Sequence, residues 1–235
     1  MRIRTWVAAG AVVIGLAAPV LAVTSASAAT GSKATNGAVT AEVSFVHAIP
    51  GLPVDVYVSG TKLLSDFTFQ TVTGEYPLDA GARHFAIRPA GAKPRSKPIL
   101  SATKILSPGE SATVVIYLSP TGTPELKAFV NATGAVAAGN ARVIVRHVAE
   151  APAVDVFVGT ASTIGVRVIK DLTNPHQASL VIPHTTLYVR VFAAGTKTHP
   201  VIGPTKFTFH ADTTTIIYAV GSLAAKTLTI VSQSY

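Results

Sequence analysis

The chain has 235 residues, of which 49% are hydrophobic and 13% are charged, and its formal net charge is +8 at pH 7. This apolar composition predicts a packed core and excludes a chain that is disordered throughout. The sequence contains no cysteine, which excludes a disulfide scaffold, thiol catalysis and thiolate metal sites. The moderate excess of basic residues weakly favours acidic polymers or anionic surfaces as partners.

The N-terminus has the pattern of a secretory signal peptide. Two arginines precede the uncharged apolar run of residues 7–23, and an Ala-x-Ala cleavage sequence ends at Ala28. We predict that residues 1–28 are a signal peptide, cleaved near Ala28, and that the protein is secreted or loosely associated with the cell wall. An uncleaved anchor is the alternative, but the run is at the lower edge of spanning length and contains a proline. We expect no membrane span in the mature chain.

Beyond this segment, the chain has the pattern of two repeats of short strands. Residues 29–41 are small and polar and predict a flexible leader, and the Ala/Gly-rich residues 131–141 predict a linker between repeats at 42–130 and 142–235. Apolar residues alternate with a period of two, and turn residues recur about every ten positions. We predict an all-β chain of two tandem antiparallel β-sandwich domains, immunoglobulin-like in form, with a small barrel as the alternative.

One motif occurs in both repeats, as VHAIPGLPVDVYV at residues 46–58 and RHVAEAPAVDVFV at residues 146–158. It aligns His47 with His147 and Asp55 with Asp155. An Ala-Gly pair further along also recurs, at an offset that is four residues larger. Small insertions in loops between matched strands are typical of a duplicated domain.

The repeated histidine and aspartate have two interpretations. On the functional one, each repeat holds a His–Asp pair able to orient a base or to bind a metal. However, no Ser, Glu or further His recurs in both repeats, and no zinc-protease or nucleophile-elbow motif is present. On the structural one, the aspartate accepts turn amides and the histidine donates to a carbonyl or to the aspartate, which specifies one hairpin register. We predict the structural role, with no catalytic, cofactor or metal site.

The surroundings of this motif resemble a known family. Residues 43–58, VSFVHAIPGLPVDVYV, are followed by GTKLL at residues 60–64 and by RPAG at residues 88–91. This succession resembles the bacterial secreted family called domain of unknown function 4397. The second repeat is a more distant match, with Phe157 in place of Tyr57. The resemblance covers both repeats. It implies an extracytoplasmic β-sandwich in two tandem copies, no established activity and no catalytic residues.

A basic stretch, RPAGAKPRSKP, spans residues 88–98. Its four cations are Arg88, Lys93, Arg95 and Lys97, and the matching corner of the second repeat keeps Lys197. We interpret it as an exposed loop that could bind an anionic ligand, such as an acidic wall polymer or a lipid headgroup; a solvated loop without a ligand is the alternative. Nucleic acid is not expected as a partner, because no aromatic residues are interleaved with the cations.

These features predict a secreted, non-enzymatic cell-envelope interaction or adhesion module, whose tandem domains add avidity for a cell-wall polymer or another extracellular protein. One alternative is a hydrolase or metal-dependent enzyme that uses the His/Asp pairs, and another is a structural spacer. A carbohydrate platform is disfavoured, because the only tryptophan lies in the signal peptide. Tyr117 and Tyr218, which align with each other, lie in apolar strands and are expected in the core.

Overall fold

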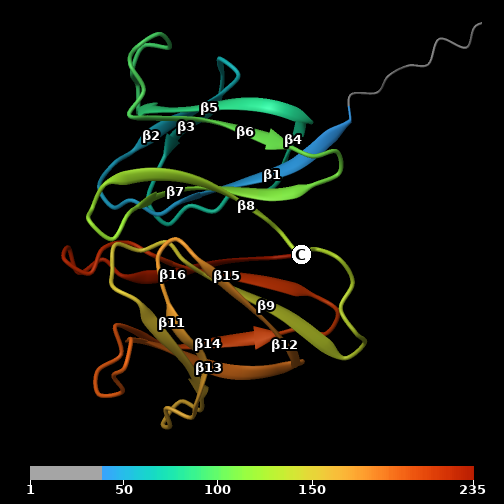
Figure 1. The fold of residues 1–235 in the computed structure, drawn as a ribbon, viewed down its shortest axis with the longest axis vertical. Helices are drawn as coiled ribbons and strands as arrows, with labels where there is room; N and C mark the ends of the chain where they lie inside the picture. The colour runs from blue at the N-terminus through green and yellow to red at the C-terminus, as the bar shows by residue number, and fades with distance from the viewer. Residues whose placement is uncertain (1–38) are drawn as a thin grey trace, which may run out of the picture. The chain divides into compact units, whose positions relative to one another are not determined.

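The computed structural model describes residues 39–235, and the regular secondary structure of this part of the chain consists of β-strands alone (Figure 1). The all-β class predicted from the period-two pattern is therefore confirmed. The predicted signal peptide lies outside the described residues, as does most of the predicted leader. The described residues belong to one compact unit. They include no helix long and apolar enough to span a membrane.

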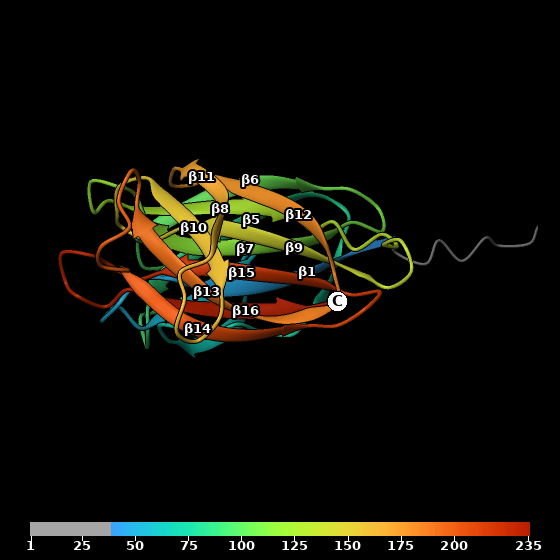
Figure 2. The ribbon, with the colours of Figure 1, turned by 90° about the horizontal axis from the view of Figure 1, so that it is seen from below.

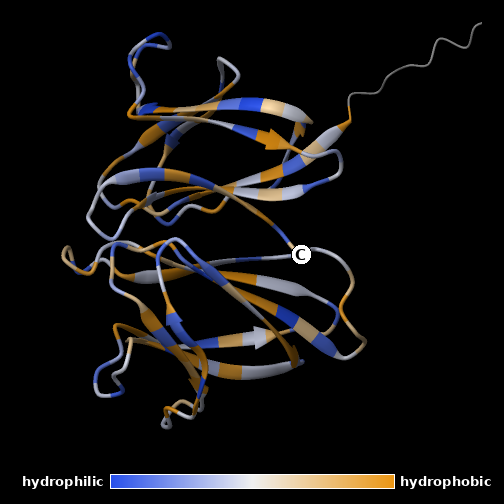
Figure 3. Cartoon of the chain, in the orientation of Figure 1, coloured by the Kyte–Doolittle hydropathy of each residue, from blue (hydrophilic) through white to orange (hydrophobic). Residues whose placement is uncertain are grey.

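The first half of the described chain, residues 40–130, forms two four-stranded sheets. Its strands are β1 (Thr40–His47), β2 (Val54–Val58), β3 (Thr61–Phe67), β4 (Tyr76–Asp79), β5 (Gly81–Pro89), β6 (Leu100–Leu106), β7 (Ser111–Leu118) and β8 (Pro124–Val130). The sheet orders are β4-β1-β7-β8 and β3-β2-β5-β6. Side chains from both sheets meet in one hydrophobic core, and hydrophobic positions alternate with hydrophilic ones along many strands (Figure 3).

The second half, residues 140–235, repeats this arrangement strand by strand. Its strands are β9 (Asn140–His147), β10 (Val154–Gly159), β11 (Val166–Leu172), β12 (Gln177–Pro183), β13 (Thr185–Ala193), β14 (Ile202–Phe209), β15 (Thr214–Val220) and β16 (Thr229–Ser234). The sheet orders are β12-β9-β15-β16 and β11-β10-β13-β14, which are those of the first half shifted by eight strands. Each half is thus a pair of four-stranded sheets around its own core, as in a β-sandwich.

The predicted antiparallel arrangement is wrong for one strand pair in each half. β1 pairs with β7 and β9 pairs with β15 in parallel, whereas the other strand pairs of the described chain are antiparallel. A tight hairpin forces two strands to be antiparallel, but β1 and β7 are separated by five other strands. The chain therefore has room to return and enter the sheet beside β1 in the same direction.

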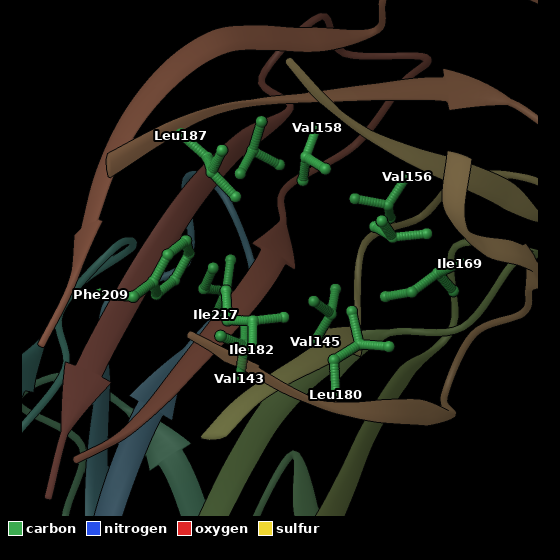
Figure 4. A pocket seen from close by; sticks show the side chains of 12 residues that line it. Val143, Val145, Val156, Val158, Ile169, Leu180, Ile182, Leu187, Phe209 and Ile217 are labelled. Carbon is green, nitrogen blue, oxygen red and sulfur yellow. The ribbon is translucent and has the colours of Figure 1, made fainter. Parts of the chain in front are cut away.

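The two halves fill their cores differently. In the first core, the Phe45 ring packs edge-to-face on Phe85 and on Tyr76, with centroid separations of 6.1 Å in both contacts. The strand registers place Val145 at the position of Phe45, Val189 at that of Phe85 and Leu180 at that of Tyr76. A cavity of about 40 Å³, lined only by apolar side chains that include these three, lies there (Figure 4).

A third hydrophobic cluster joins the halves. The sheet that contains β1 and β7 faces the sheet that contains β9 and β15 (Figures 1 and 2). The buried side chains between them are Val46, Ala48, Val115, Tyr117, Phe129, Ile144, Val148, Ile216, Tyr218 and Val220. The halves are therefore held together by buried apolar surface as well as by the connecting chain.

Tyr117 and Tyr218 are buried as expected, but they lie in this third cluster rather than inside either sandwich. They are also not structural counterparts. Val46 pairs with Val115, whereas Arg146 pairs with Tyr218, so the counterpart of Tyr218 is Val115. The alignment by sequence was off by two residues, and a shift of two leaves every side chain on the same face of a strand.

Arg146 is the one arginine of the described chain that is fully buried, and it lies at this contact between the halves. Its guanidinium donates to the Tyr218 hydroxyl at 2.7 Å, to the Val130 carbonyl at 3.1 Å and to the Gln177 side chain at 2.9 Å. It also lies 4.6 Å from the Phe129 ring centroid. Burial lowers the pKa of Arg146, and burial raises the pKa of Tyr218 to about 12. The charge is thus stabilised by neutral acceptors and an aromatic face.

Candidate functional site

His47 and its counterpart His147 each close the turn that follows the first strand of their half. In His47, Nε2 faces the Leu52 carbonyl at 2.9 Å, and Nδ1 faces the Ile49 amide at 3.2 Å. A carbonyl can only accept and an amide N–H can only donate, so Nε2 carries the proton and Nδ1 does not. His147 makes the same two contacts at 2.9 Å and 3.4 Å. Both rings are therefore neutral donors and acceptors for the backbone.

Burial lowers the pKa of His47 and of His147, although the carbonyl bond to each ring opposes this shift. A charged ring would lack the lone pair that accepts the backbone amide. Because both nitrogens of each ring are already engaged, neither ring has a free nitrogen for a metal or for a substrate proton.

Asp55 is buried on the outer side of β2 and holds a bulge in the neighbouring strand β3. The Lys62 ammonium donates to its Oδ2 at 2.6 Å, and the Asp66 amide donates to its Oδ1 at 3.1 Å. Asp66 has a φ of +48°, which is the left-handed conformation of a bulge residue. The Gly91 amide also acts on this carboxylate and lowers its pKa.

Asp155 makes the same set of contacts in the second half. Arg167 donates to its Oδ2 at 2.8 Å, the Asp171 amide donates to Oδ1 at 2.9 Å, and the Gly195 amide donates to Oδ2 at 3.1 Å. Asp171 has a φ of +50°, close to that of its counterpart in β3. Each repeated aspartate therefore joins its strand to a bulge and to the Ala-Gly turn after β5 or β13.

Burial by itself raises the pKa of Asp55 and of Asp155. The hydrogen bonds from the neighbouring cation and from the backbone amides outweigh it, so the pKa of each carboxyl lies below its ordinary value. Both groups are ionised at neutral pH, and their charge is balanced by a cation on the adjacent strand.

The sequence did not reveal these partners, although a signal for them was present. Lys62 and Arg167 are both cations, Asp66 and Asp171 are both aspartates, and the offset is 105 in both pairs. This recurrence becomes visible only when the insertion before β11 is placed correctly.

The histidine and the aspartate of each repeat do not meet. No hydrogen bond joins His47 to Asp55 or His147 to Asp155 in the described chain, because each side chain is bonded to other partners. Residues 39–235 also contain no group of three or more His, Cys, Asp or Glu side chains that could hold a metal ion. In residues 39–235, the four repeated side chains therefore bind backbone groups and, for the aspartates, a neighbouring cation.

The basic loop, which we define as residues 89–99, lies over the outer face of β2 and β5. Arg88, at the end of β5, stacks on Tyr57 with 4.5 Å between its Cζ and the ring centroid, and its Nε donates to the Ser96 carbonyl at 3.0 Å. The Lys62 ammonium lies 5.5 Å from the same ring centroid. We call these four residues, Tyr57, Lys62, Arg88 and Ser96, the loop cluster.

The five predicted anion-binding residues divide into two groups. Arg88 is half-buried in the loop cluster, whereas Lys93, Arg95 and Lys97 are exposed on the basic loop. Lys197 is exposed in the second half, with its ammonium 5.1 Å from the Phe157 ring centroid. Of the five, three are therefore exposed together on the basic loop, Arg88 lies half-buried in the loop cluster, and Lys197 is exposed on a separate loop of the second half.

The fold and the site define an all-β protein built from paired four-stranded sheets, with a repeated Asp–cation device on the outer face of one sheet in each half. The family model of the domain of unknown function DUF4397 matches residues 41–157, which supports the family resemblance over the first half and the beginning of the second. The matched segment runs from β1 to β10 and so extends into the second half.

No curated protein matches the chain. Among solved structures, the Bacillus anthracis TIE protein aligns with 79% of this chain at 12% sequence identity and a TM-score of 0.24. The chain spans about a third of that protein, 34% of its length.

Proposed function

We propose that the chain is a secreted, non-enzymatic interaction module of two tandem DUF4397-type β-sandwich domains, immunoglobulin-like in general form, that binds an anionic polymer of the cell envelope. One observation carries this proposal: Lys93, Arg95 and Lys97 project from a loop that Asp55 and Arg88 tie to the sheet. Three exposed cations on one loop form a surface that attracts a polyanion. The signal-peptide pattern of residues 1–28 supports export to a compartment where such polymers occur.

The repeated His and Asp side chains do not bind each other in the described chain, which supports a binding role over catalysis. A general base must lie within hydrogen-bond reach of the proton that it removes. In the described chain, His47 and His147 use both ring nitrogens on the backbone, and each aspartate is bound by a cation and by amides. Stoichiometric metal in the purified protein would contradict this part of the proposal.

The test is a sedimentation assay with residues 29–235 and cell walls isolated from a Gram-positive bacterium. We expect the protein to pellet with the walls at low salt and to be released at high salt, because salt screens exposed charges beyond about 10 Å at 0.1 M. Replacing Lys93, Arg95 and Lys97 with alanine should abolish pelleting.

The matched control replaces three exposed lysines of the second half, Lys170, Lys206 and Lys226, with alanine. It removes the same charge and should leave most of the pelleting intact. Equal loss in both variants would show that net charge, not the basic loop, is responsible. No pelleting of the parent protein would refute the envelope-binding function.

A further inference from the structure

The loop cluster contains two buried hydroxyl groups without an acceptor. The Tyr57 hydroxyl and the Ser96 Oγ are inaccessible to solvent, and neither meets a hydrogen-bond acceptor among the described residues. The Lys62 ammonium, a donor, lies near the Tyr57 oxygen, and Asp55 and then Tyr57 raise the pKa of Lys62. Tyr57 is only 2% exposed. Buried polar groups almost always have a hydrogen-bond partner. Two buried hydroxyls without an acceptor beside one arginine therefore indicate a ligand that supplies acceptors.

The charge of the loop cluster is also unbalanced. Lys62 is paired with Asp55, but no ion pair of the described chain includes Arg88. The Nε of Arg88 is used by the Ser96 carbonyl, and its two terminal nitrogens make no hydrogen bond to residues 39–235. These two nitrogens are the pair with which an arginine binds a phosphate in the bidentate manner.

The basic loop is attached so that its middle can lift. Its ends are fixed by the Ala90 amide, which donates to the Pro53 carbonyl at 3.0 Å, and by the Ile99 amide, which donates to the Ile87 carbonyl at 2.7 Å. Between these ends, the Gly91 amide acts on the Asp55 carboxylate, and the Arg88 side chain donates to the Ser96 carbonyl. Beyond Gly91, the Arg88–Ser96 hydrogen bond holds the middle of the loop to the sheet, so a ligand can reach the cluster when this bond opens and the Gly91 turn stays in place.

We propose that the loop cluster is a phosphate-binding site, in which the Arg88 terminal nitrogens and the Tyr57 and Ser96 hydroxyls donate to the oxygens of one phosphate group. Because Asp55 balances the charge of Lys62, the net positive charge of the cluster comes from Arg88. The inference rests on the proposed function, since it names the group of the anionic polymer that is recognised. All these groups are donors, and a phosphate offers more acceptor oxygens for them than a carboxylate does.

The second half provides a natural control, because its equivalent positions lack these donors. Phe157 stands in place of Tyr57 and Phe192 in place of Arg88, and these two rings pack edge-to-face at 5.3 Å. We therefore expect one phosphate site per chain rather than two.

The test titrates residues 29–235 with inorganic phosphate, with a glycerol phosphodiester and with acetate, followed by NMR. We expect saturable binding of the phosphate compounds at one site, with shifts around Tyr57 and Ser96, and weaker binding of acetate. Tighter binding of the diester indicates a polymer phosphodiester as the natural source, and tighter binding of inorganic phosphate indicates free phosphate.

Tyr57→Phe should weaken phosphate binding about tenfold, as expected for one lost hydrogen bond to a charged group, and Ser96→Ala should act in the same direction. The midpoint of thermal unfolding should change little in Tyr57→Phe, because the deleted hydroxyl donates to no acceptor in the described chain and Lys62 keeps its bond to Asp55. Tyr188→Phe, in the second half, is the matched control and should bind phosphate as the parent does.

Unchanged phosphate affinity in Tyr57→Phe and Ser96→Ala, or no saturable phosphate binding at all, would overturn the site. The wall assay on the same variants separates the two proposals. If walls are bound but Tyr57→Phe binds them normally, the site is wrong and the envelope function stands. If phosphate saturates the site but walls are not bound, the site stands and the envelope function fails.

Discussion

The two halves of this protein share a framework and differ in what fills it. Both keep the strand order, the turn-closing histidine and the bulge-holding aspartate. The first core is filled by Phe45 and its aromatic neighbours, whereas the second has Val145 at the same place and a cavity of about 40 Å³. The difference teaches that these polar contacts are compatible with more than one apolar filling of the core.

A second difference lies on the outer face that carries the basic loop. The first half has Tyr57 and Arg88 there, and the second half has Phe157 and Phe192. Both halves keep the buried aspartate, Asp55 or Asp155, that binds the turn after β5 or β13. The scaffold of the site is therefore common to the two halves, and its ligand-binding groups belong to one of them.

The largest effect that we expect comes from Arg146→Ala, at a position where the first half has Val46. The change leaves a cavity and removes the donor from the Val130 carbonyl and the Tyr218 hydroxyl. We expect a loss of about 3–5 kcal/mol in the free energy of unfolding, measured by chemical denaturation. Val46→Ala is the control and should cost less. A loss below about 1 kcal/mol for Arg146→Ala would show that the halves do not need this contact.

The next effect tests the buried aspartate that each half uses to bind a cation and backbone amides. Asp155→Asn removes the charge that faces Arg167 and replaces one acceptor oxygen with a donor, so one backbone amide loses its partner. We expect a loss of about 1–3 kcal/mol, and a similar loss for Asp55→Asn. Asp79→Asn is the control, because Asp79 is largely exposed and its ion pair with Arg83 lies at the surface. Equal losses in the free energy of unfolding for Asp79→Asn and Asp155→Asn would show that the contacts of the buried aspartate do not stabilise the fold.

A smaller effect concerns pH, and both halves should contribute to it. Because the pKa values of His47 and His147 are lowered in the folded protein, the unfolded chain binds more protons as the pH falls below about 6.5. Stability should therefore decrease on acidification, by up to about 1.4 kcal/mol per histidine for each pH unit between the unfolded and folded pKa values.

The pH dependence is measured from unfolding curves between pH 7.5 and about 5, a range centred on the ordinary histidine pKa. His147→Gln should weaken this dependence, although it also lowers stability at neutral pH. His210→Gln, at an exposed histidine, is the control. The aspartates act at lower pH: their stabilisation is present above the unfolded pKa of about 3.9 and is lost as the pH falls through the lowered folded value.

The smallest effect has the opposite sign and tests the difference between the cores. Val145→Ile adds one methylene group into the cavity of the second half and should raise the free energy of unfolding by about 0.5–1 kcal/mol. The same addition in the first core, Val43→Ile, should lower it, because Val43 is fully buried in the core that the Phe45 ring and its aromatic neighbours fill. Stabilisation by both changes, or by neither, would contradict the difference in packing.

Much of the fold could be predicted from the sequence, because it follows from local pattern. Alternation with a period of two indicated strands, and the recurrence of His47 and Asp55 at His147 and Asp155 indicated a repeated architecture. The exposure of Lys93 and its neighbours followed from a proline-rich basic stretch. The parallel pairing of β1 with β7 could not be predicted, because strand direction depends on the path of the whole chain.

The partners of these residues were set by tertiary structure. The sequence by itself showed that Asp55 and Arg146 are charged residues within apolar strands. A buried charge needs a partner in any fold, so the need for a partner could be read from the sequence. It did not determine the partner: Lys62 binds Asp55 from the adjacent strand β3, and Arg146 binds the Val130 carbonyl in the other half. Hydrophobic alternation specifies a face and not a neighbour, because a strand shifted by two residues buries the same face, and only packing in three dimensions selects one register.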